Sequence, residues 1–178
     1  MKKVIVFLLL TVSIVSAGGF TLRSNIISGQ LGFDQVFNGF GCSGKNISPD
    51  LSWINAPKST KSFAITMYDP DAPTGSGWWH WLVFDIPKDI VSLKENAGNI
   101  DLSLMPRTII QSKTDFGEAG FGGACPPKGD KAHKYIFTIY ALDIEKLGLN
   151  KDSNPALVGY YLNSHTILKS SIISYFGR

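Results

Sequence analysis

Long apolar runs are scarce in this sequence, and so is any excess of one charge. The longest apolar run, Val4 to Val15, has about 12 residues, whereas a helix that spans a bilayer needs roughly 20. The formal net charge is +3, and it falls to +1 without Lys2 and Lys3. A broad basic surface of the kind that binds nucleic acid is therefore excluded. We expect no nucleic-acid partner and no stable membrane insertion.

The first 17 residues have the parts of a secretory signal peptide. Lys2 and Lys3 precede the apolar run, and residues 15–17 (VSA) supply the small-residue site that signal peptidase cuts. No cysteine stands at that site, so a lipid anchor is not indicated. We predict a signal peptide at residues 1–17 and a single domain at residues 18–178, in the periplasm or secreted.

Cysteine is also scarce, because the chain has only Cys42 and Cys125, each in a glycine-rich segment. Export to an oxidising compartment favours one disulfide between them over two buried thiols. The two residues are 83 positions apart, so closing this loop would stabilise the fold by about 4 kcal/mol in the chain-entropy model.

Alternating apolar and polar positions predict several β-strands. Residues 62–68, 78–86 and 133–143 alternate with the period of two that is typical of strands, and a further strand is expected near residues 108–111. In the second of these strands, we expect one face to carry Trp78, His80, Leu82, Phe84 and Ile86.

The end of the chain predicts a helix. Asn154 followed by Pro155 is a typical helix start. Positions at helical spacing then follow at Leu157, Tyr161, His165, Leu168 and Ile172. We expect this amphipathic helix to close the chain, with His165 packed on its apolar face.

Two histidines occur in matched surroundings. A loop rich in proline and glycine precedes a strand that begins near His80, and the same arrangement recurs at His133. A buried imidazole needs a polar partner, and the carboxylates of Asp69 and Asp71 are available in the first loop. Tyr135 and the backbone N–H groups of Gly122 and Gly123 are expected as further hydrogen-bond donors. The walls are expected from Trp78, Pro126 and Pro127. These residues predict a small pocket for phosphate or sulfate.

Other kinds of chemistry fit the same residues. His80, His133 and an aspartate would form a facial metal triad, although no close spacing supports metal binding. Cys125 would be a nucleophile with His133 as its base, provided that it is not in a disulfide. Either histidine would also serve as general acid or base in a weak hydrolase or phosphatase, oriented by Asp69. We expect neither a metal nor another cofactor.

Two long segments resemble the signature motifs of the phosphatidylethanolamine-binding protein family. They are residues 69–81 (DPDAPTGSGWWHW) and 122–135 (GGACPPKGDKAHKY). Shorter similarities lie at residues 39–53 (GFGCSGKNISPDLSW), 114–117 (TDFG) and 156–160 (ALVGY), so the resemblance covers nearly all of the predicted domain. The sequence is similar in particular to secreted members of the bacterial Raf-kinase-inhibitor-like branch.

The resemblance implies a mainly β, antiparallel sandwich-like domain with short helices and a C-terminal helix beside an anion pocket. It implies a cis peptide between Ala72 and Pro73, and it supports the disulfide. Lys134 departs from the family pattern, which usually has arginine there. The ligand-binding residues that the resemblance implies are Asp69, Ala72, Pro73, Trp78, His80, Gly123, Pro126, Pro127, His133 and Tyr135.

We therefore expect a binding protein without catalytic activity, whose partner is a small phosphate-like anion or a phospholipid head group. A weak hydrolase that uses His80, His133 and Asp69 is the first alternative. The second is a secreted effector that acts on other proteins through its surface. The sequence leaves the oligomeric state open, a homodimer included.

Overall fold

The protein is described here by a computed structural model that covers residues 18–178, so the predicted signal peptide lies outside the described residues. Its largest sheet has five antiparallel strands in the order β10-β9-β5-β6-β8. The strands of this sheet are β5 (Ser62–Asp69), β6 (Trp78–Pro87), β8 (Ile110–Gln111), β9 (His133–Leu142) and β10 (Thr166–Phe176).

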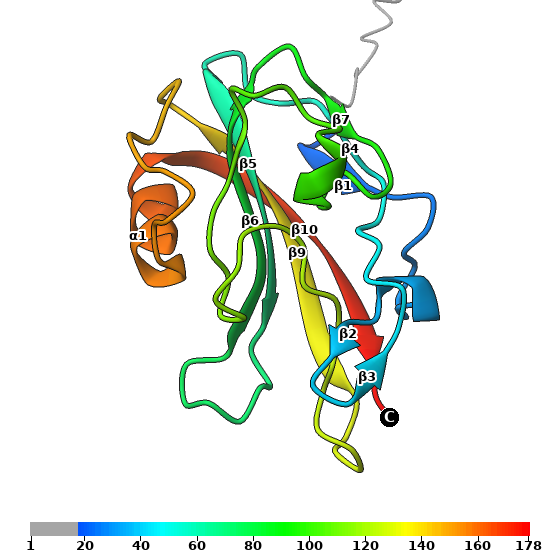
Figure 1. The fold of residues 1–178 in the computed structure, drawn as a ribbon. Coiled ribbons are helices and arrows are strands. Elements are labelled where there is room, and N and C mark those ends of the chain that lie inside the picture. The colour runs from blue at the N-terminus through cyan, green and yellow to red at the C-terminus, as the bar shows by residue number, and fades with distance from the viewer. Residues whose placement is uncertain (1–17) are drawn as a thin grey trace, which may run out of the picture.

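A smaller sheet and a helix cover the two faces of the large sheet (Figure 1). The smaller sheet has the order β1-β4-β7, and a separate hairpin pairs β2 with β3. The remaining elements are β1 (Thr21–Arg23), η1 (Phe33–Gln35), β2 (Asn38–Gly39), β3 (Cys42–Ser43), β4 (Leu51–Ile54), β7 (Ser92–Leu93), η2 (Ile100–Leu102) and α1 (Pro155–His165). The predicted antiparallel sandwich with short helices is confirmed.

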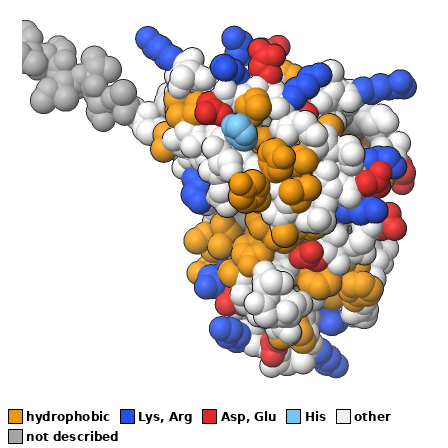
Figure 2. All heavy atoms as spheres, turned by 90° about the vertical axis from the view of Figure 1, so that its left-hand side faces the viewer, with side chains coloured by type: hydrophobic (Ala, Val, Ile, Leu, Met, Phe, Trp, Pro, Cys, Tyr) orange, Lys and Arg blue, Asp and Glu red, His pale blue; other side chains and the backbone are white. Residues whose placement is uncertain are grey.

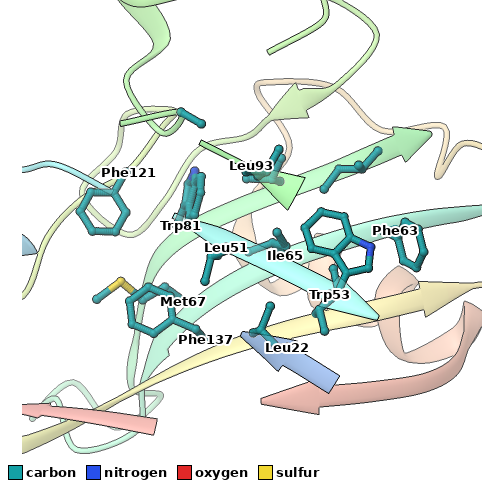
Figure 3. Packing of buried hydrophobic residues seen from close by; sticks show 14 of the residues in the cluster. Leu22, Leu51, Trp53, Phe63, Ile65, Met67, Trp81, Leu93, Phe121 and Phe137 are labelled. Atoms are coloured by element: carbon teal, nitrogen blue, oxygen red, sulfur yellow. The ribbon is translucent and has the colours of Figure 1, made fainter. Parts of the chain in front are cut away.

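The main core lies between the two sheets (Figure 3). The alternation predicted for β5 is confirmed, because Phe63, Ile65 and Met67 enter this core while Ala64 packs on the opposite side, under α1. Trp53 of β4 contacts Phe63 edge to face, with ring centroids 5.3 Å apart. Both faces of β5 are therefore buried, which explains why it has apolar residues on each of them.

The predicted faces of β6 are wrong in part, because two β-bulges give this strand two extra residues relative to β5. Met67 pairs with Trp81 and Tyr68 with Trp79, so His80 is the extra residue of a β-bulge. A second bulge contains Asp85, which has a φ of 58°. Each bulge exchanges the two faces of the strand. As a result Leu82 and Phe84 pack under α1 with Trp79, whereas Trp81, Val83 and Ile86 enter the main core.

The predicted helix start is confirmed, but the helix does not close the chain. Asn154 Oδ1 accepts a hydrogen bond from the N–H of Leu157, and Pro155 is the first helical residue. The helix ends at His165, and residues 166–176 form β10, the edge strand beside β9. The sequence of β10 is rich in β-branched residues, which favours a strand over a further helical turn.

The outer face of the molecule around α1 is partly apolar, and Figure 2 shows hydrophobic side chains gathered there. Leu157 and Tyr160 of α1 are 40% and 69% exposed. Across residues 18–178, helices fall short of the length and apolar character that crossing a bilayer requires.

Candidate ligand pocket

One end of the five-stranded sheet brings the sequence-predicted site residues together. Because the sheet is antiparallel, the last residue of β5, Asp69, pairs with Trp78 at the start of β6 and contacts His133 at the start of β9. A pocket of about 160 Å³ opens at this end, which is room for about five water molecules. Its lining is Phe40, Asp69, Ala72, Pro73, Thr74, Trp78, His80, Phe116, Cys125, Pro126, Pro127 and His133.

Asp69 and His133 form a buried pair in the pocket wall. Their side chains are joined by a 2.8 Å contact between Asp69 Oδ2 and His133 Nδ1, and the residues are 2% and 1% exposed. The carboxylate makes Nδ1 the proton-bearing nitrogen of the neutral ring and fixes the ring orientation. His133 Nε2 is thereby left for a partner other than Asp69.

His80 is also buried, but its partners are backbone carbonyls and not the predicted aspartates. Its Nδ1 lies 2.8 Å from the carbonyl oxygen of Gly122 and 3.1 Å from that of Gly123, so this nitrogen carries the proton. Burial lowers the pKa of His80 to about 4, which keeps the ring neutral at pH 7. Its Nε2 is therefore a hydrogen-bond acceptor.

The prediction that the N–H groups of Gly122 and Gly123 donate to an anion is wrong, because both groups have hydrogen-bond partners within the protein. Gly122 N–H donates to the carbonyl of His80 at 2.8 Å, and Gly123 N–H donates to Asn46 Oδ1 at 2.7 Å. An added Cβ at Gly123 would collide with the backbone of residues 35–37, so this glycine allows two chain segments to approach closely. Gly123 supports the pocket from behind and is not part of its lining.

The loop after β5 forms the wall opposite that segment. Asp69 Oδ1 accepts hydrogen bonds from the N–H groups of Asp71 and Ala72 at 2.8 and 3.1 Å. The predicted cis peptide between Ala72 and Pro73 is wrong, since every peptide bond among residues 18–178 is trans. The N–H of Thr74 donates to the carbonyl of Ala72 at 2.8 Å, so a tight turn around Pro73 shapes this loop.

Two side chains at the pocket have polar atoms without a protein partner. Trp78 lines the pocket, and its indole Nε1 is buried and unpaired within residues 18–178. Tyr135 lies behind His80 with ring centroids 5.2 Å apart, and its buried hydroxyl is also unpaired there. Burial raises the pKa of this hydroxyl far above its usual value, so it stays protonated. Tyr135 is close to the pocket but does not line it.

The rim of the pocket carries both signs of charge. Asp130 Oδ2 lies 3.5 Å from His133 Nε2 and is half exposed. Asp71 does not orient a histidine as predicted. Instead it accepts from the N–H of Lys134 at 2.9 Å, which lowers the pKa of its carboxyl. The ammonium groups of Lys131 and Lys134 lie 3.7 Å from the same carboxylate.

Two aromatic residues of the lining, Phe40 and Phe116, were not predicted from the sequence. Phe116 packs against His80 with ring centroids 5.3 Å apart, and Phe40 lies 5.6 Å from Phe116. Both phenylalanines stand in segments that resemble family motifs, GFGCSGKNISPDLSW and TDFG, so that resemblance was the available signal. The supporting residue Asn46 belongs to the first of these segments.

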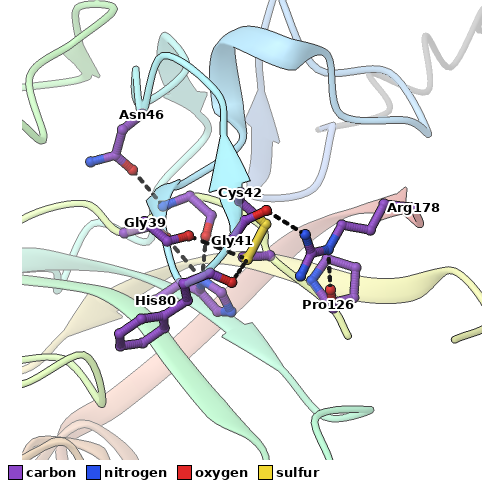
Figure 4. The surroundings of a disulfide bond; sticks show 11 residues. Gly39, Gly41, Cys42, Asn46, His80, Pro126 and Arg178 are labelled. Carbon is purple, nitrogen blue, oxygen red and sulfur yellow. Dashed lines mark hydrogen bonds between the residues drawn. A yellow bond between two sulfur atoms is a disulfide. The ribbon is translucent and has the colours of Figure 1, made fainter. Parts of the chain in front are cut away.

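The predicted disulfide is present in the structure (Figure 4). Cys42 and Cys125 are bonded, with Cα atoms 6.0 Å apart. The alternative in which Cys125 is a nucleophile is excluded for this oxidised form, because a disulfide sulfur is not a thiolate. Throughout residues 18–178, moreover, no group of three His, Cys, Asp or Glu side chains is arranged to hold a metal ion.

The sandwich and the pocket between the two histidine strands define a known class of protein. The model of the family described as phosphatidylethanolamine-binding protein matches residues 28–177, and the chain belongs to this family.

Bacterial members are among its relatives. The UPF0098 protein YbcL of Escherichia coli K12 is 52% identical over 158 residues, which cover 88% of this chain and 86% of YbcL. The UPF0098 protein YbhB of the same organism is 49% identical over 141 residues, covering 79% and 88% of the two chains. The crystal structure of E. coli YbcL, described as a new member of the mammalian PEBP family, is similar to this one with a TM-score of 0.88 at 50% sequence identity. The match covers 90% of this chain and 99% of the YbcL chain.

Proposed function

We propose that this protein is a non-enzymatic binding protein that takes a small phosphate-like anion into the pocket between His80 and His133. The observation that carries this proposal is the way both imidazoles are held. Each ring uses its Nδ1 inside the protein, one on Asp69 and one on two carbonyls. Each ring also lines the pocket. The two Nε2 atoms and the unpaired Trp78 Nε1 are then available to a single polar guest.

The protonation state of His80 defines which form of the guest fits. A neutral His80 accepts a hydrogen bond, so its partner must carry a proton, as a singly protonated phosphate monoester does. A doubly charged phosphate requires His80 to take up a proton first. Either route binds one proton with the ligand. Because the second pKa of a phosphate monoester is about 6, we expect its affinity to fall about 50-fold between pH 6 and pH 8.

Asp130 competes with an anion for the same position beside His133 Nε2. Its carboxylate lies 3.5 Å from His133 Nε2, where it occupies the position of a ligand oxygen and repels negative charge. A bound anion must displace it. We therefore expect Asp130→Asn to raise the affinity for phosphate severalfold, and an unchanged or lower affinity would count against this binding position.

Asparagine substitutions test the proposal without disturbing the inner hydrogen bonds. In His133→Asn and His80→Asn the amide nitrogen replaces Nδ1–H towards Asp69 or the glycine carbonyls, and only Nε2 is lost. A hydrogen bond to a charged group contributes about 1.5–3 kcal/mol, so each variant should lose at least about tenfold in affinity. Calorimetry with phosphorylethanolamine at pH 6 measures this loss. His165→Asn, which alters a histidine outside the pocket lining, is the matched control.

The same variants decide between binding and catalysis. The Asp69–His133 pair has the geometry of a carboxylate that orients a general base, which is the observation in favour of a weak phosphatase. The binding proposal predicts no turnover of a phosphate monoester above that of the Asn variants. Turnover by the wild type that both variants abolish would replace it with the hydrolase.

The proposal extends to where the protein acts and what carries the anion. The leader pattern of residues 1–17 supports export of a single domain, residues 18–178, to the periplasm or the medium. The family description names phosphatidylethanolamine, which supports a phospholipid head group as the guest. A head group within a lipid is a phosphodiester, which cannot carry the second proton. Calorimetry with glycerophosphoethanolamine beside phosphorylethanolamine at pH 6 distinguishes the two, since the diester has no proton to donate to the neutral His80 and should bind more weakly than the monoester.

A further inference from the structure

One wall of the pocket is a hairpin tip that a disulfide and Arg178 attach to the segment opposite. This tip, the 38–43 hairpin, consists of β2, β3 and the residues between them. Phe40 of this hairpin is 70% exposed and lines the pocket. The hairpin faces the segment with Cys125 and Pro126, which also line the pocket.

The first attachment is the disulfide and the second is Arg178 (Figure 4). Cys42 bonds to Cys125, whose Sγ lies 3.7 Å from the carbonyl oxygens of Gly39 and Phe40. Arg178 joins the same two segments, because its Nη1 donates to the carbonyl of Gly41 at 2.6 Å and its Nε donates to the carbonyl of Pro126 at 2.7 Å.

The base of the hairpin is held independently of these two attachments. Phe37 N–H donates to the carbonyl of Ala124 at 3.0 Å, and Gly44 N–H donates to the carbonyl of Phe37 at 2.9 Å. Loss of the disulfide would therefore loosen the tip with Phe40 and leave the strands below it in place.

We propose that the Cys42–Cys125 disulfide and Arg178 are positioning groups of the pocket, and that reduction of the disulfide weakens ligand binding. This inference rests on the proposed function, because it concerns the same pocket. The affinity for the phosphate-like anion then depends on the redox state of the compartment in which the protein resides. Cys42 and Cys125 are the only cysteines in the sequence, so any effect of a thiol reductant can be assigned to this disulfide.

A reductant can reach the disulfide through the pocket. Cys125 lines the pocket, whereas Cys42 is 9% exposed and lies outside the lining. A dithiol reductant attacks Cys125 through its thiolate, and Cys42 leaves as a thiolate that is then protonated. The second thiol of the reductant displaces Cys125 from the mixed disulfide. Two electrons pass to the protein, which ends with two thiols, and the reductant ends as a cyclic disulfide. A ligand in the pocket covers Cys125 and should slow the first step.

Binding and reduction are linked in both directions. If the oxidised form binds phosphate tenfold more tightly than the reduced form, saturating phosphate must stabilise the disulfide by the same factor. For this two-electron couple a factor of ten corresponds to about 30 mV, so the midpoint potential should become more negative by about 30 mV. A solely structural disulfide would show no such dependence on phosphate.

The test measures phosphate affinity at pH 6 in the oxidised and reduced wild type, with circular dichroism to confirm that the reduced protein is folded. We expect a loss of about tenfold, increased hydrogen exchange confined to the 38–43 hairpin, and the shift in potential with phosphate. The double variant Cys42→Ser, Cys125→Ser is the control for the reductant and should bind equally weakly with and without it. Affinities of the oxidised and folded reduced forms that agree within twofold would overturn the inference.

Arg178→Gln keeps the inference testable if the reduced protein unfolds. This variant retains the disulfide and removes the second attachment. We expect a threefold or greater loss of phosphate affinity, whereas an affinity within experimental error of the wild type would overturn the inference. Failure of the oxidised wild type to bind phosphate is a different result, because it overturns the proposed function itself.

Discussion

The burial of His80 should make the protein less stable in acid by a predictable amount. The folded-state pKa of this ring is about 4, because burial disfavours the charged form, whereas the unfolded chain titrates near 6.5. Between these values the unfolded chain binds a proton that the folded protein does not, so the free energy of unfolding falls as the pH falls. His80 alone should lower it by about 2 kcal/mol between pH 7.5 and pH 5, and by about 3 kcal/mol once the pH is below 4.

Urea denaturation of the wild type and of His80→Asn at pH 7.5, 6 and 5 measures this contribution. The asparagine amide keeps a donor towards the carbonyls of Gly122 and Gly123 but does not titrate. Asp69, His133 and the other titrating groups are present in both proteins, so their effects largely cancel in the difference. The wild type should lose about 2 kcal/mol more than the variant between pH 7.5 and pH 5. Parallel pH profiles for the two proteins would refute the argument that His80 is held neutral by burial.

Three further predictions concern stability at neutral pH. Replacing both Cys42 and Cys125 with serine should lower the free energy of unfolding by about 4 kcal/mol in urea denaturation, since the bond closes a loop of 83 residues; a loss below 1 kcal/mol would contradict the loop-entropy account. Gly123→Ala should cost about 3 kcal/mol because its Cβ would collide with backbone atoms, whereas Gly19→Ala, with free space around it, should be almost neutral. Asn154→Ala removes the cap of α1 and should cost about 1 kcal/mol; an unchanged thermal midpoint would exclude the capping role.

Local sequence patterns were sufficient to predict those features that depend on residues close together in the chain. The alternation of β5 and β9, the start of α1 at Asn154 and the family-like motifs all belong to this kind. The disulfide was predictable because only two cysteines are present and the leader indicates an oxidising compartment.

The errors arose where distant segments decide the outcome. The bulge at His80 is defined by its pairing with β5, and no periodicity within 78–86 reveals an extra residue. The N–H of Gly123 was expected to face a ligand, but Asn46, far away in the sequence, accepts its hydrogen bond. Leu168 fits helical spacing, yet it pairs with Ala141 of β9, so tertiary pairing overrides the helical pattern.

Most of the candidate site was predicted, including Ala72, Pro73, Trp78, Pro126 and Pro127 of its apolar lining, but Phe40 and Phe116 were missed. Asp69, His80 and His133 stand out because buried polar groups need an explanation. Phe40 was indicated only by its place in a family-like motif, and Arg178 by nothing in the sequence, since an exposed aromatic ring or arginine is ordinary on a surface. Their roles follow only from contacts with Phe116, Gly41 and Pro126.

The most direct test of the central claim is a crystal structure of the protein soaked with phosphorylethanolamine at pH 6. We expect one phosphate group in the pocket, with oxygen atoms about 3 Å from the Nε2 atoms of both His80 and His133 and with Asp130 displaced. A pocket that stays free of phosphate at saturating ligand, or phosphate bound only elsewhere on the protein, would contradict it.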